Sequence, residues 1–508
     1  MPIGLQKSTP DHKSANEISK NLFPVVGIGA SAGGLEAFKQ LIKSIPEKSG
    51  MAYIIVQHLH PEYESALPEI LQRESSIPVV EIIDKVHVAP DFIYVIPANK
   101  LLTASGGILQ LSARSDQKKT LSIDLFFSSL AEVHRSQSIG VLLSGTGTDG
   151  TNGLEDIKNY GGVTIAQSSE TAAYDGMPKN AIDAGIVDFV LPPGEIVAKL
   201  LELQQAFQNH DPAKKSVFDK ISEDGFRSIL GLLRVRIGVD FNFYKQTTIR
   251  RRIIRRMMIL KLKSIQEYHH HLKNDAPEID LLFQDLLIQV TSFFRDPKTY
   301  DVLCNKVLPE IIKNNSGDNT LRIWIPGCAT GQEAYTFAIC LSEFLSTHAI
   351  VARVKIFGTD LSEKSITKAR TGIYSKAETE GLSDKVLNQY FIKTESQYQL
   401  KKDIRDMCIF AVHNFLTDPP FAKMNLISCR NVLIYFEPFL QKKALNLFHY
   451  ALNEKGFLLL GRSESVGNVS ELFSVFDKMN KFFTRKHAPV RFMNVISRHN
   501  ETAYANKN

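Results

Sequence analysis

Residues 23–34, FPVVGIGASAGG, decide the fold of the first part of the chain. A short apolar run leads directly into a glycine-rich turn, which is typical of a buried parallel strand that enters a helix. Similar apolar runs follow, and helix-like stretches of about 10 to 20 residues separate several of them. These runs lie at residues 52–56, 92–96, 138–143, 162–166 and 187–191. The alternation predicts a doubly wound α/β domain with a parallel sheet over residues 22–203.

The rest of the chain divides into further segments, as its 508 residues exceed what one hydrophobic core accommodates. Residues 218–285 carry only helical patterns, which predicts a small all-helical subdomain. Residues 286–487 return to strand and helix alternation, with LRIWIPG, VKIFGTD, NLISC and GFLLLG as expected strands of a Rossmann-like domain. Polar composition assigns residues 1–21 to a leader, 204–217 to a linker and 488–508 to a tail.

Composition excludes several classes of protein. The 60 basic and 54 acidic residues leave a net charge of only +6, so nucleic acid is not expected as a ligand. None of the 5 cysteines lies in a CxxC pair, which favours neither a disulfide framework nor a zinc site and indicates a reducing cytoplasm. No run of about eighteen apolar residues occurs, so we expect no direct membrane insertion. We also expect no metal.

Three polar residues follow apolar strands in the first domain. Ser31 sits in a Gly-x-Ser-x-Gly turn, which exposes a serine hydroxyl at the carboxyl edge of a sheet, although the same glycines suit a phosphate or dinucleotide loop. His58 follows AYIIVQ, and Asp149 lies near the end of SIGVLLSGTGTDG, after its apolar strand, so all three belong to one sheet edge. Together they predict a nucleophile, its base and an orienting carboxylate. His60 is a rival base, because alternate strand residues share a face.

A second glycine turn lies in the last domain. The strand of LRIWIPG ends in residues 327–331, GCATG, and the next strand ends in Asp360 about thirty residues later. The turn lets backbone approach a nucleoside, and the carboxylate binds ribose hydroxyls. This pair suits S-adenosylmethionine as well as a dinucleotide, and a generic Rossmann-like turn is the remaining alternative.

The first domain resembles the CheB methylesterase catalytic domain over nearly all of residues 22–200. GIGASAGG, VQHLHP, LLSGTGTDG and AAYDGMPKNAIDAG look like its successive signatures. The resemblance implies that Ser31, His58 and Asp149 form a catalytic triad that hydrolyses glutamate methyl esters on a chemoreceptor. It also implies that the same machinery could deamidate glutamine. Thr146 departs from the family, which commonly has methionine there.

Residues 218–487 resemble the CheR methyltransferases, including their helical subdomain. TSFFRDP, PGCATGQEAY, FGTDLS and ISCRNVLIYF look like the family signatures in the right order. The resemblance implies that Arg295 and Tyr435 frame the reacting centre and that Gln332 replaces a common acidic residue. It further implies that S-adenosylmethionine contacts Arg295, Glu333, Asp360, Asn414, Asn431 and Val432.

A strongly basic helix is expected within residues 247–263. Its arginines are close enough to form one broad face, which is either a solvated surface or, as the resemblance implies, a docking surface for acidic receptor helices. The arginines are Arg250, Arg251, Arg252, Arg255 and Arg256. His269 to His271 are a weaker candidate for a metal site, because adjacent helical histidines diverge around the axis.

The resulting hypothesis is a cytoplasmic enzyme with two opposed activities. Its expected partner is the cytoplasmic domain of methyl-accepting chemoreceptors or of receptor-like signalling proteins. The resemblance also predicts a small β insertion at residues 385–412, but its turn contains no glycine, which disfavours the binding of a receptor-tail peptide. About twenty residues precede the first strand, too few for a receiver domain, so none is expected there. A scaffold without turnover and an NAD-dependent oxidoreductase remain the alternatives.

Overall fold

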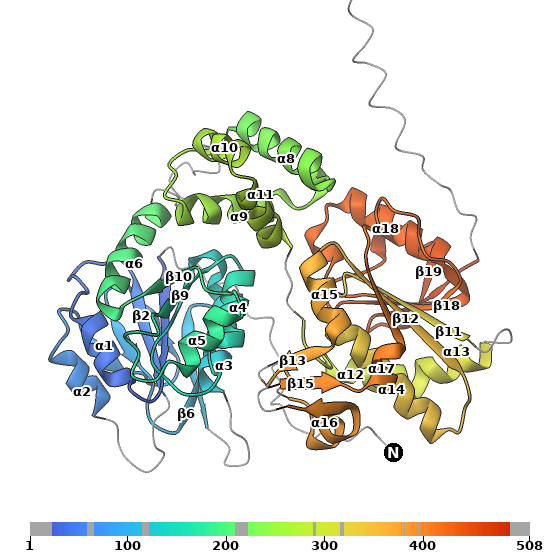
Figure 1. Ribbon diagram of the computed structural model, residues 1–508, viewed down its shortest axis with the longest axis horizontal. Helices are drawn as coiled ribbons and strands as arrows, with labels where there is room; N and C mark the ends of the chain where they lie inside the picture. Colours follow the sequence, from blue (N-terminus) through green and yellow to red (C-terminus); the bar gives the residue numbers. More distant parts are fainter. Residues whose placement is uncertain are drawn as a thin grey trace, which may run out of the picture. The chain divides into compact units, whose positions relative to one another are not determined.

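The computed structural model describes residues 23–57, 66–113, 121–208, 222–287, 291–314, 320–376, 378–379, 381–394 and 397–487 (Figure 1). The described residues form two compact units. The first comprises residues 23–293 with 371–400, and the second comprises residues 294–370 with 401–487. Each unit contains one seven-stranded sheet.

The sheet of the first unit is parallel throughout, in the order β10-β9-β8-β1-β2-β5-β3. Its strand β1 is buried along its whole length and lies between β2 and β8, where Val25 is opposite Ala52 and Ser138. This confirms the predicted doubly wound sheet. The strands are β1 (Val25–Ala30), β2 (Ala52–Gln57), β3 (Val79–Glu81), β5 (Ile93–Val95), β8 (Ser138–Leu142), β9 (Val163–Gln167) and β10 (Phe189–Leu191).

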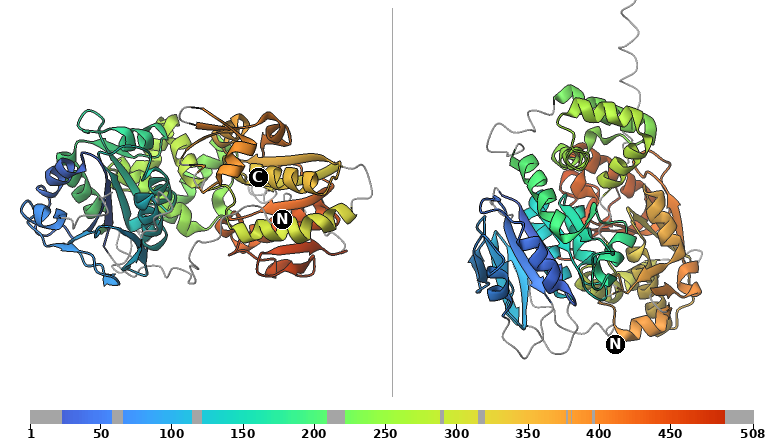
Figure 2. Two further views of the ribbon diagram at one scale, coloured as in Figure 1. Left: turned by 90° about the horizontal axis from the view of Figure 1, so that it is seen from below. Right: turned by 60° about the vertical axis from the view of Figure 1, so that its left-hand side comes forward.

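Helices cover both faces of this sheet, because its strands are apolar on both sides (Figures 1 and 2). One face packs against α1 (Gly34–Ile42), α2 (Leu67–Gln72) and α6 (Pro193–Gln208). The other packs against α3 (Ser122–His134), α4 (Thr151–Asn159) and α5 (Gly176–Asp183), and the 3-10 turn η1 (Arg135–Gln137) follows α3. Helix α6 continues to Gln208, five residues into the stretch expected to be a linker.

A small antiparallel sheet, absent from the sequence-based expectation, lies against α3. It consists of β4 (Val86–His87), β6 (Lys100–Ser105) and β7 (Ile108–Ala113), in the order β4-β7-β6. The backbone N–H of Ala104 donates to Ser129 Oγ at 2.9 Å, which ties β6 to α3. Helix α3 therefore packs between this sheet and the main one.

The helical subdomain is confirmed. The elements are α8 (Glu223–Ile237), η2 (Phe241–Phe243), α9 (Gln246–Ile259), α10 (Ile265–Asn274) and α11 (Ala276–Leu286). Side chains cap the starts of α8 and α10: Ser222 Oγ accepts from Gly225 N at 3.2 Å, and Ser264 Oγ accepts from Glu267 N at 3.1 Å.

The β insertion begins earlier in the chain than expected. Its antiparallel strands are β13 (Ile373–Ser375), β14 (Phe391–Lys393) and β15 (Gln397–Leu400), in the order β13-β15-β14, and α16 (Asp384–Tyr390) precedes β14. Phe293 packs edge-on against Tyr374 and Phe391, which gives the small sheet an aromatic core.

The second unit has the order β16-β12-β11-β17-β18-β20-β19, parallel except for β19 and β20 at one edge. Trp324 on β11 packs edge-on against Phe448 of α18. The strands are β11 (Thr320–Pro326), β12 (Arg353–Asp360), β16 (Cys408–Val412), β17 (Met424–Cys429), β18 (Leu452–Leu460), β19 (Phe473–Asp477) and β20 (Phe482–Arg485). The helices are α12 (Pro297–Val302), α13 (Leu308–Asn314), α14 (Gln332–Thr347), α15 (Glu363–Thr371), α17 (Lys402–Asp406) and α18 (Pro438–Ala451).

Among the described helices, none combines the length and the apolar composition that crossing a bilayer requires.

Candidate active sites

Ser31 lies in the turn between β1 and α1, at the carboxyl edge of the first sheet, and is half-buried. Its backbone N–H donates to the carbonyl of Ser144 at 2.9 Å, and its own carbonyl accepts from Gly34 N at 3.0 Å. A side chain at Gly145 would meet Ser31 Cβ at 3.0 Å and Met177 Sδ at 2.1 Å. Only glycine therefore lets the loop after β8 approach the serine this closely.

Ser144 is a buried support of this turn that the sequence did not single out. Its N–H donates to Gln167 Oε1 at 2.8 Å, its hydroxyl donates to the carbonyl of Ala32 at 2.9 Å, and its oxygen accepts from Tyr174 N at 3.0 Å. A serine directly after an apolar strand was the available signal. Ser144 thus joins the nucleophile turn to the segment that precedes α5.

Asp149 is buried beside the first turn of α3. Its Oδ2 accepts from Ile123 N at 3.0 Å and its Oδ1 accepts from Asp124 N at 2.8 Å. Asp124 Oδ1 in turn accepts from Gly153 N at 2.7 Å in the first turn of α4. Asp149, just before α4, therefore binds the start of α3, and Asp124 of α3 binds the start of α4. These reciprocal bonds hold Asp149 in place.

The expected base, His58, and its rival, His60, both lie outside the described residues. The strand that leads to them is described: β2 ends at Gln57, which is opposite Ala30 at the end of β1. The order β8-β1-β2 places the carboxyl ends of these three strands side by side. Ser31 and the loop that carries Asp149 follow two of those ends, and residue 58 follows the third.

In the second unit, Asp360 lies at the end of β12, next to the turn after β11. Its Oδ2 accepts from Ala329 N at 2.9 Å and its Oδ1 accepts from Ser362 N at 2.9 Å. Burial raises the pKa of Asp360, and the hydrogen bonds from backbone N–H groups oppose that rise. A carboxylate has about four acceptor positions, so Asp360 retains the capacity to accept from a ribose hydroxyl of S-adenosylmethionine.

The turn of Gly327 approaches the loop after β17. A side chain at Gly327, whose φ is 72°, would lie 2.5 Å from a methyl group of Val432. The residue before Val432, Asn431, has a φ of 60°, and its N–H donates to Glu464 Oε2 at 3.0 Å. Glu464 is buried and also accepts from Gly461 N at 2.6 Å, so it shapes the loop, although sequence reasoning did not identify it.

Arg430 is the centre of a buried ion network in this unit. Its Nη2 donates to Asp296 Oδ2 at 2.7 Å and to the carbonyl of Arg295 at 2.9 Å, and its Nη1 donates to Glu333 Oε2 at 3.3 Å and to the Tyr300 hydroxyl at 3.0 Å. Burial alone would lower the pKa of Arg430, but the carboxylates of Glu333 and Asp296 hold it above the ordinary value. An arginine directly after a buried strand was the signal for this residue.

The structure brings some of the predicted cofactor residues together. Arg430 joins the Arg295 loop to Glu333, whose other oxygen accepts from Ser428 Oγ at 2.6 Å. Asn414 follows β16, and its N–H donates to Asp418 Oδ2 at 2.8 Å. Tyr435 lies half-buried in the 3-10 turn η4 (Leu433–Tyr435), three residues beyond Val432. Gln332, the family departure, is buried and accepts from Thr330 Oγ1 at 2.7 Å.

The prediction that the arginines of α9 form an exposed basic docking face is wrong. Arg250, Arg252, Arg255 and Arg256 are only 9%, 4%, 1% and 8% exposed, and Arg251 is half-buried. The first four are paired inside the chain, because the apolar residues of α9 draw the whole helix into contact with its neighbours. Arg250 pairs with Glu223 at 2.5 Å, and Arg256 pairs with Glu278 at 2.5 Å.

The described residues contain no group of three or more His, Cys, Asp or Glu side chains arranged to hold a metal ion. Of the adjacent histidines on α10, His271 lies 3.4 Å from Asp275, which directly follows this helix.

Three family models match the chain in succession. They are described as CheB methylesterase, at residues 26–200, the all-alpha domain of CheR methyltransferase, at residues 224–287, and the SAM-binding domain of CheR methyltransferase, at residues 289–482. The first range corresponds to the domain of the first sheet, the second to the helices α8 to α11, and the third to the domain of the second sheet.

Curated relatives match the same segments. A chemotaxis protein methyltransferase of Borreliella burgdorferi is 31% identical over 48% of this chain and 89% of its own length. A protein-glutamate methylesterase/protein-glutamine glutaminase of Thermotoga maritima is 34% identical over 35% of this chain and 54% of its own length.

A longer relative spans both parts. An uncharacterized 104.1 kDa protein of Rhodobacter capsulatus is 35% identical over 82% of this chain and 46% of its own length, so the chain spans about half of that relative. The chain therefore belongs to the CheR family of chemotaxis methyltransferases, and it joins their helical and SAM-binding domains to a CheB methylesterase domain.

Proposed function

We propose that this chain transfers methyl groups from S-adenosylmethionine to glutamate side chains of a chemoreceptor-like protein and hydrolyses the resulting esters. The observation that carries the hydrolase half is the arrangement of β8, β1 and β2, whose neighbouring carboxyl ends precede Asp149, Ser31 and residue 58. The carboxylate at the end of β12 supports the transferase half. The proposed site of action is the cytoplasm, on the cytoplasmic domain of such a receptor.

In the proposed hydrolysis, His58 removes the hydroxyl proton of Ser31, and the serine oxygen attacks the ester carbonyl. Asp149 orients the imidazole and stabilises its charged form. The rigid hold of α3 on Asp149 supports this role, because an orienting carboxylate must keep its position. Methanol leaves with the proton from His58, and water then hydrolyses the acyl-enzyme.

The backbone N–H of Thr146 is the proposed oxyanion donor. Thr146 is exposed in the loop after β8, and no described residue accepts a hydrogen bond from its N–H. A backbone donor is independent of the side chain, so threonine instead of the usual methionine leaves the donor in place. The same machinery would release ammonia from glutamine, as the name of the Thermotoga maritima relative indicates for that protein.

For methyl transfer, the protein's main task is orientation. A glutamate carboxylate has an unperturbed pKa of about 4.3, so it is already ionised at neutral pH and needs no general base. S-adenosylmethionine supplies a methyl group activated by its sulfonium. Arg295 and Tyr435 would align the carboxylate with that methyl group, while Asp360, Glu333, Asn414, Asn431 and Val432 would hold the rest of the molecule.

The experiment that tests this function uses the purified full chain, S-adenosylmethionine and membranes that contain chemoreceptors. Mass spectrometry of receptor peptides should show methyl esters on glutamate that alkali removes. No methylated glutamate on any receptor tested would favour the alternative, a scaffold that binds without turnover.

The two histidines after β2 give the first prediction. His58→Gln should eliminate methanol release, because this residue directly follows the strand end beside Ser31. His60→Gln should retain most of the activity, and methanol release by the two variants measures the difference. The opposite pattern would show that His60 is the base.

Asp360 gives the second prediction. Asp360→Ala should weaken S-adenosylmethionine binding about ten- to a hundred-fold, since charge-assisted hydrogen bonds contribute roughly 1.5 to 3 kcal/mol. Because burial raises the pKa of Asp360, protonation begins above the usual range for aspartate, and affinity should fall as the pH is lowered through that pKa. Calorimetry between pH 8 and pH 5 measures both effects. Glu363→Ala, an exposed position three residues later, is the control and should bind normally. Equal affinities for Asp360→Ala and the parent would contradict the assignment.

A further inference from the structure

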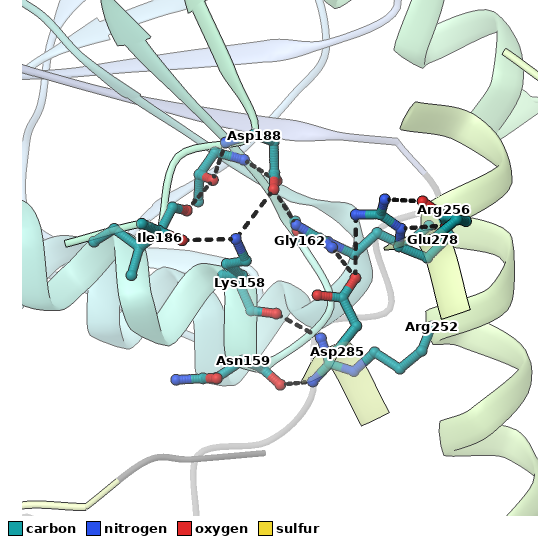
Figure 3. A network of polar contacts seen from close by, with 12 residues as sticks. Lys158, Asn159, Gly162, Ile186, Asp188, Arg252, Arg256, Glu278 and Asp285 are labelled. Atoms are coloured by element: carbon teal, nitrogen blue, oxygen red, sulfur yellow. Dashed lines mark hydrogen bonds and ion pairs between the residues drawn. The ribbon is translucent and has the colours of Figure 1, made fainter. Parts of the chain in front are cut away.

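Helix α9 contacts the methylesterase domain through Arg252 and Arg255, and Figure 3 labels Arg252 beside Lys158 and Asn159. Arg252 donates from Nη1 to the carbonyl of Lys158 at 2.5 Å and from Nη2 to the carbonyl of Asn159, at the end of α4. Carbonyl groups at a helix end have no partner within their own helix and carry negative partial charge. Arg252 therefore donates hydrogen bonds to the last carbonyl groups of α4 and places a full positive charge at that helix end.

Arg255 joins the two domains more directly. Its Nε donates to the carbonyl of Gly162 at 3.0 Å, and its two terminal nitrogens pair with Asp188 of the methylesterase domain and Asp285 of α11. Lys158 also lies 3.5 Å from Asp188. Burial alone would raise the pKa of Asp188, but Arg255 and Lys158 hold that pKa below the ordinary value.

Apolar and peripheral contacts accompany these pairs. Met258, on the same helix, packs against the methylesterase core beside α1 and α6. Beyond the helix end, Lys261 Nζ lies 3.1 Å from Glu202 of α6. The interface therefore combines a partly buried apolar contact, a buried polar centre and an exposed ion pair at its rim.

The contact lies at the edge of the sheet opposite the catalytic residues. Gly162 and Asp188 directly precede β9 and β10, so they mark the amino ends of these strands. Ser31 and Asp149 follow the carboxyl ends of β1 and β8. Helix α9 therefore binds at the edge opposite to the one that carries Ser31 and Asp149.

We propose that Arg252 and Arg255, with Asp188 and the last carbonyls of α4, form a clamp that holds the methylesterase and helical domains together as one body. Arg252 and Arg255, which the sequence assigns to an acidic partner, thus bind the chain's own methylesterase domain. The proposal does not depend on either catalytic activity.

Charge balance explains why these groups belong together. The centre contains the cations of Lys158, Arg252, Arg255 and Arg256, the carboxylates of Asp188, Glu278 and Asp285, and the end of α4. A buried charge that loses its partner is strongly disfavoured, whereas a complete set is tolerated. Separation of the domains would break the ion pair between Asp188 and Arg255. The two surfaces are therefore complementary in charge.

Cleavage of the full chain between the two domains tests the clamp. A protease site placed within residues 209–221, in the segment that joins α6 to α8, allows the purified protein to be cut under native conditions. We expect the two fragments of the parent to elute together in size-exclusion chromatography. Asp188→Asn should weaken the association of the fragments at least about a hundred-fold, as removal of one partner of a buried ion pair predicts. Arg252→Ala should weaken it about ten- to a hundred-fold, as the loss of charge-assisted hydrogen bonds predicts.

The matched control is Arg250→Ala. Arg250 is a buried arginine of the same helix, but it pairs with Glu223 and stacks on Phe226, both within the helical domain. Its fragments should still elute together. Circular dichroism of each uncut variant distinguishes loss of the clamp from loss of folding. Separation of the parent fragments, or equal association for all three variants, would overturn the clamp.

Discussion

Ser31→Ala should abolish methanol release from methylated receptor while leaving methyl transfer intact. The loss should reach about four to six orders of magnitude, because an activated serine and its base act as a unit. Methyl transfer should continue, because Asp360 and Arg430 belong to the other compact unit. Volatile methanol from receptor membranes measures the first activity, and incorporation of labelled methyl groups measures the second.

The control for this variant is Ser44→Ala, an exposed serine just after α1 in the same domain. It should release methanol at the parent rate. Unchanged methanol release in Ser31→Ala would remove the esterase mechanism, whatever the behaviour of the methyltransferase.

Arg430→Met should cause the largest loss of stability in the methyltransferase domain. Asp296 and Glu333 would lose the buried cation that they share, at a cost of about 3 to 5 kcal/mol in the free energy of unfolding. For a domain of this size the melting transition should fall by about 6 to 20 °C. Calorimetry of the full chain, with the transition assigned by its shift on adding S-adenosylmethionine, gives the measurement.

Arg462→Ala provides the comparison, because Arg462 also pairs with Asp296, at 2.8 Å, but its side chain is 67% exposed. An exposed pair contributes less than about 1 kcal/mol, so this variant should melt close to the parent. Equal melting temperatures for Arg430→Met and Arg462→Ala would show that the buried network is not what stabilises the loop of Arg295.

The parts of the fold that follow from apolar periodicity could be predicted from the sequence. The run before Ser31 is buried on both faces, and its six residues read as a central strand without any knowledge of partners. The carboxyl-edge positions of Ser31, Asp149 and Asp360 follow from the same rule, since each lies at the end of such a strand or in the loop after it.

The partners of charged residues could not be predicted in this way. Arg255 looks like a surface residue in a basic helix, yet it is buried between Asp188 and Asp285, which lie 67 and 30 residues away in the chain. Glu464 could not be identified either, because the backbone N–H that it binds, that of Asn431, lies 33 residues away in the chain. The short edge strands β3 and β19 were also missed, because an edge strand is stabilised by its neighbour and not by its own composition.

A pulse and chase on one sample tests the central claim, that a single chain both adds and removes glutamate methyl groups. Receptor membranes are labelled by the purified chain with methyl-labelled S-adenosylmethionine, and an excess of unlabelled S-adenosylmethionine follows. The account predicts that alkali-labile label appears on the receptor and then leaves as methanol in the parent, but stays on the receptor with Ser31→Ala. Absence of label, or equal retention of label by the parent and Ser31→Ala, would contradict it.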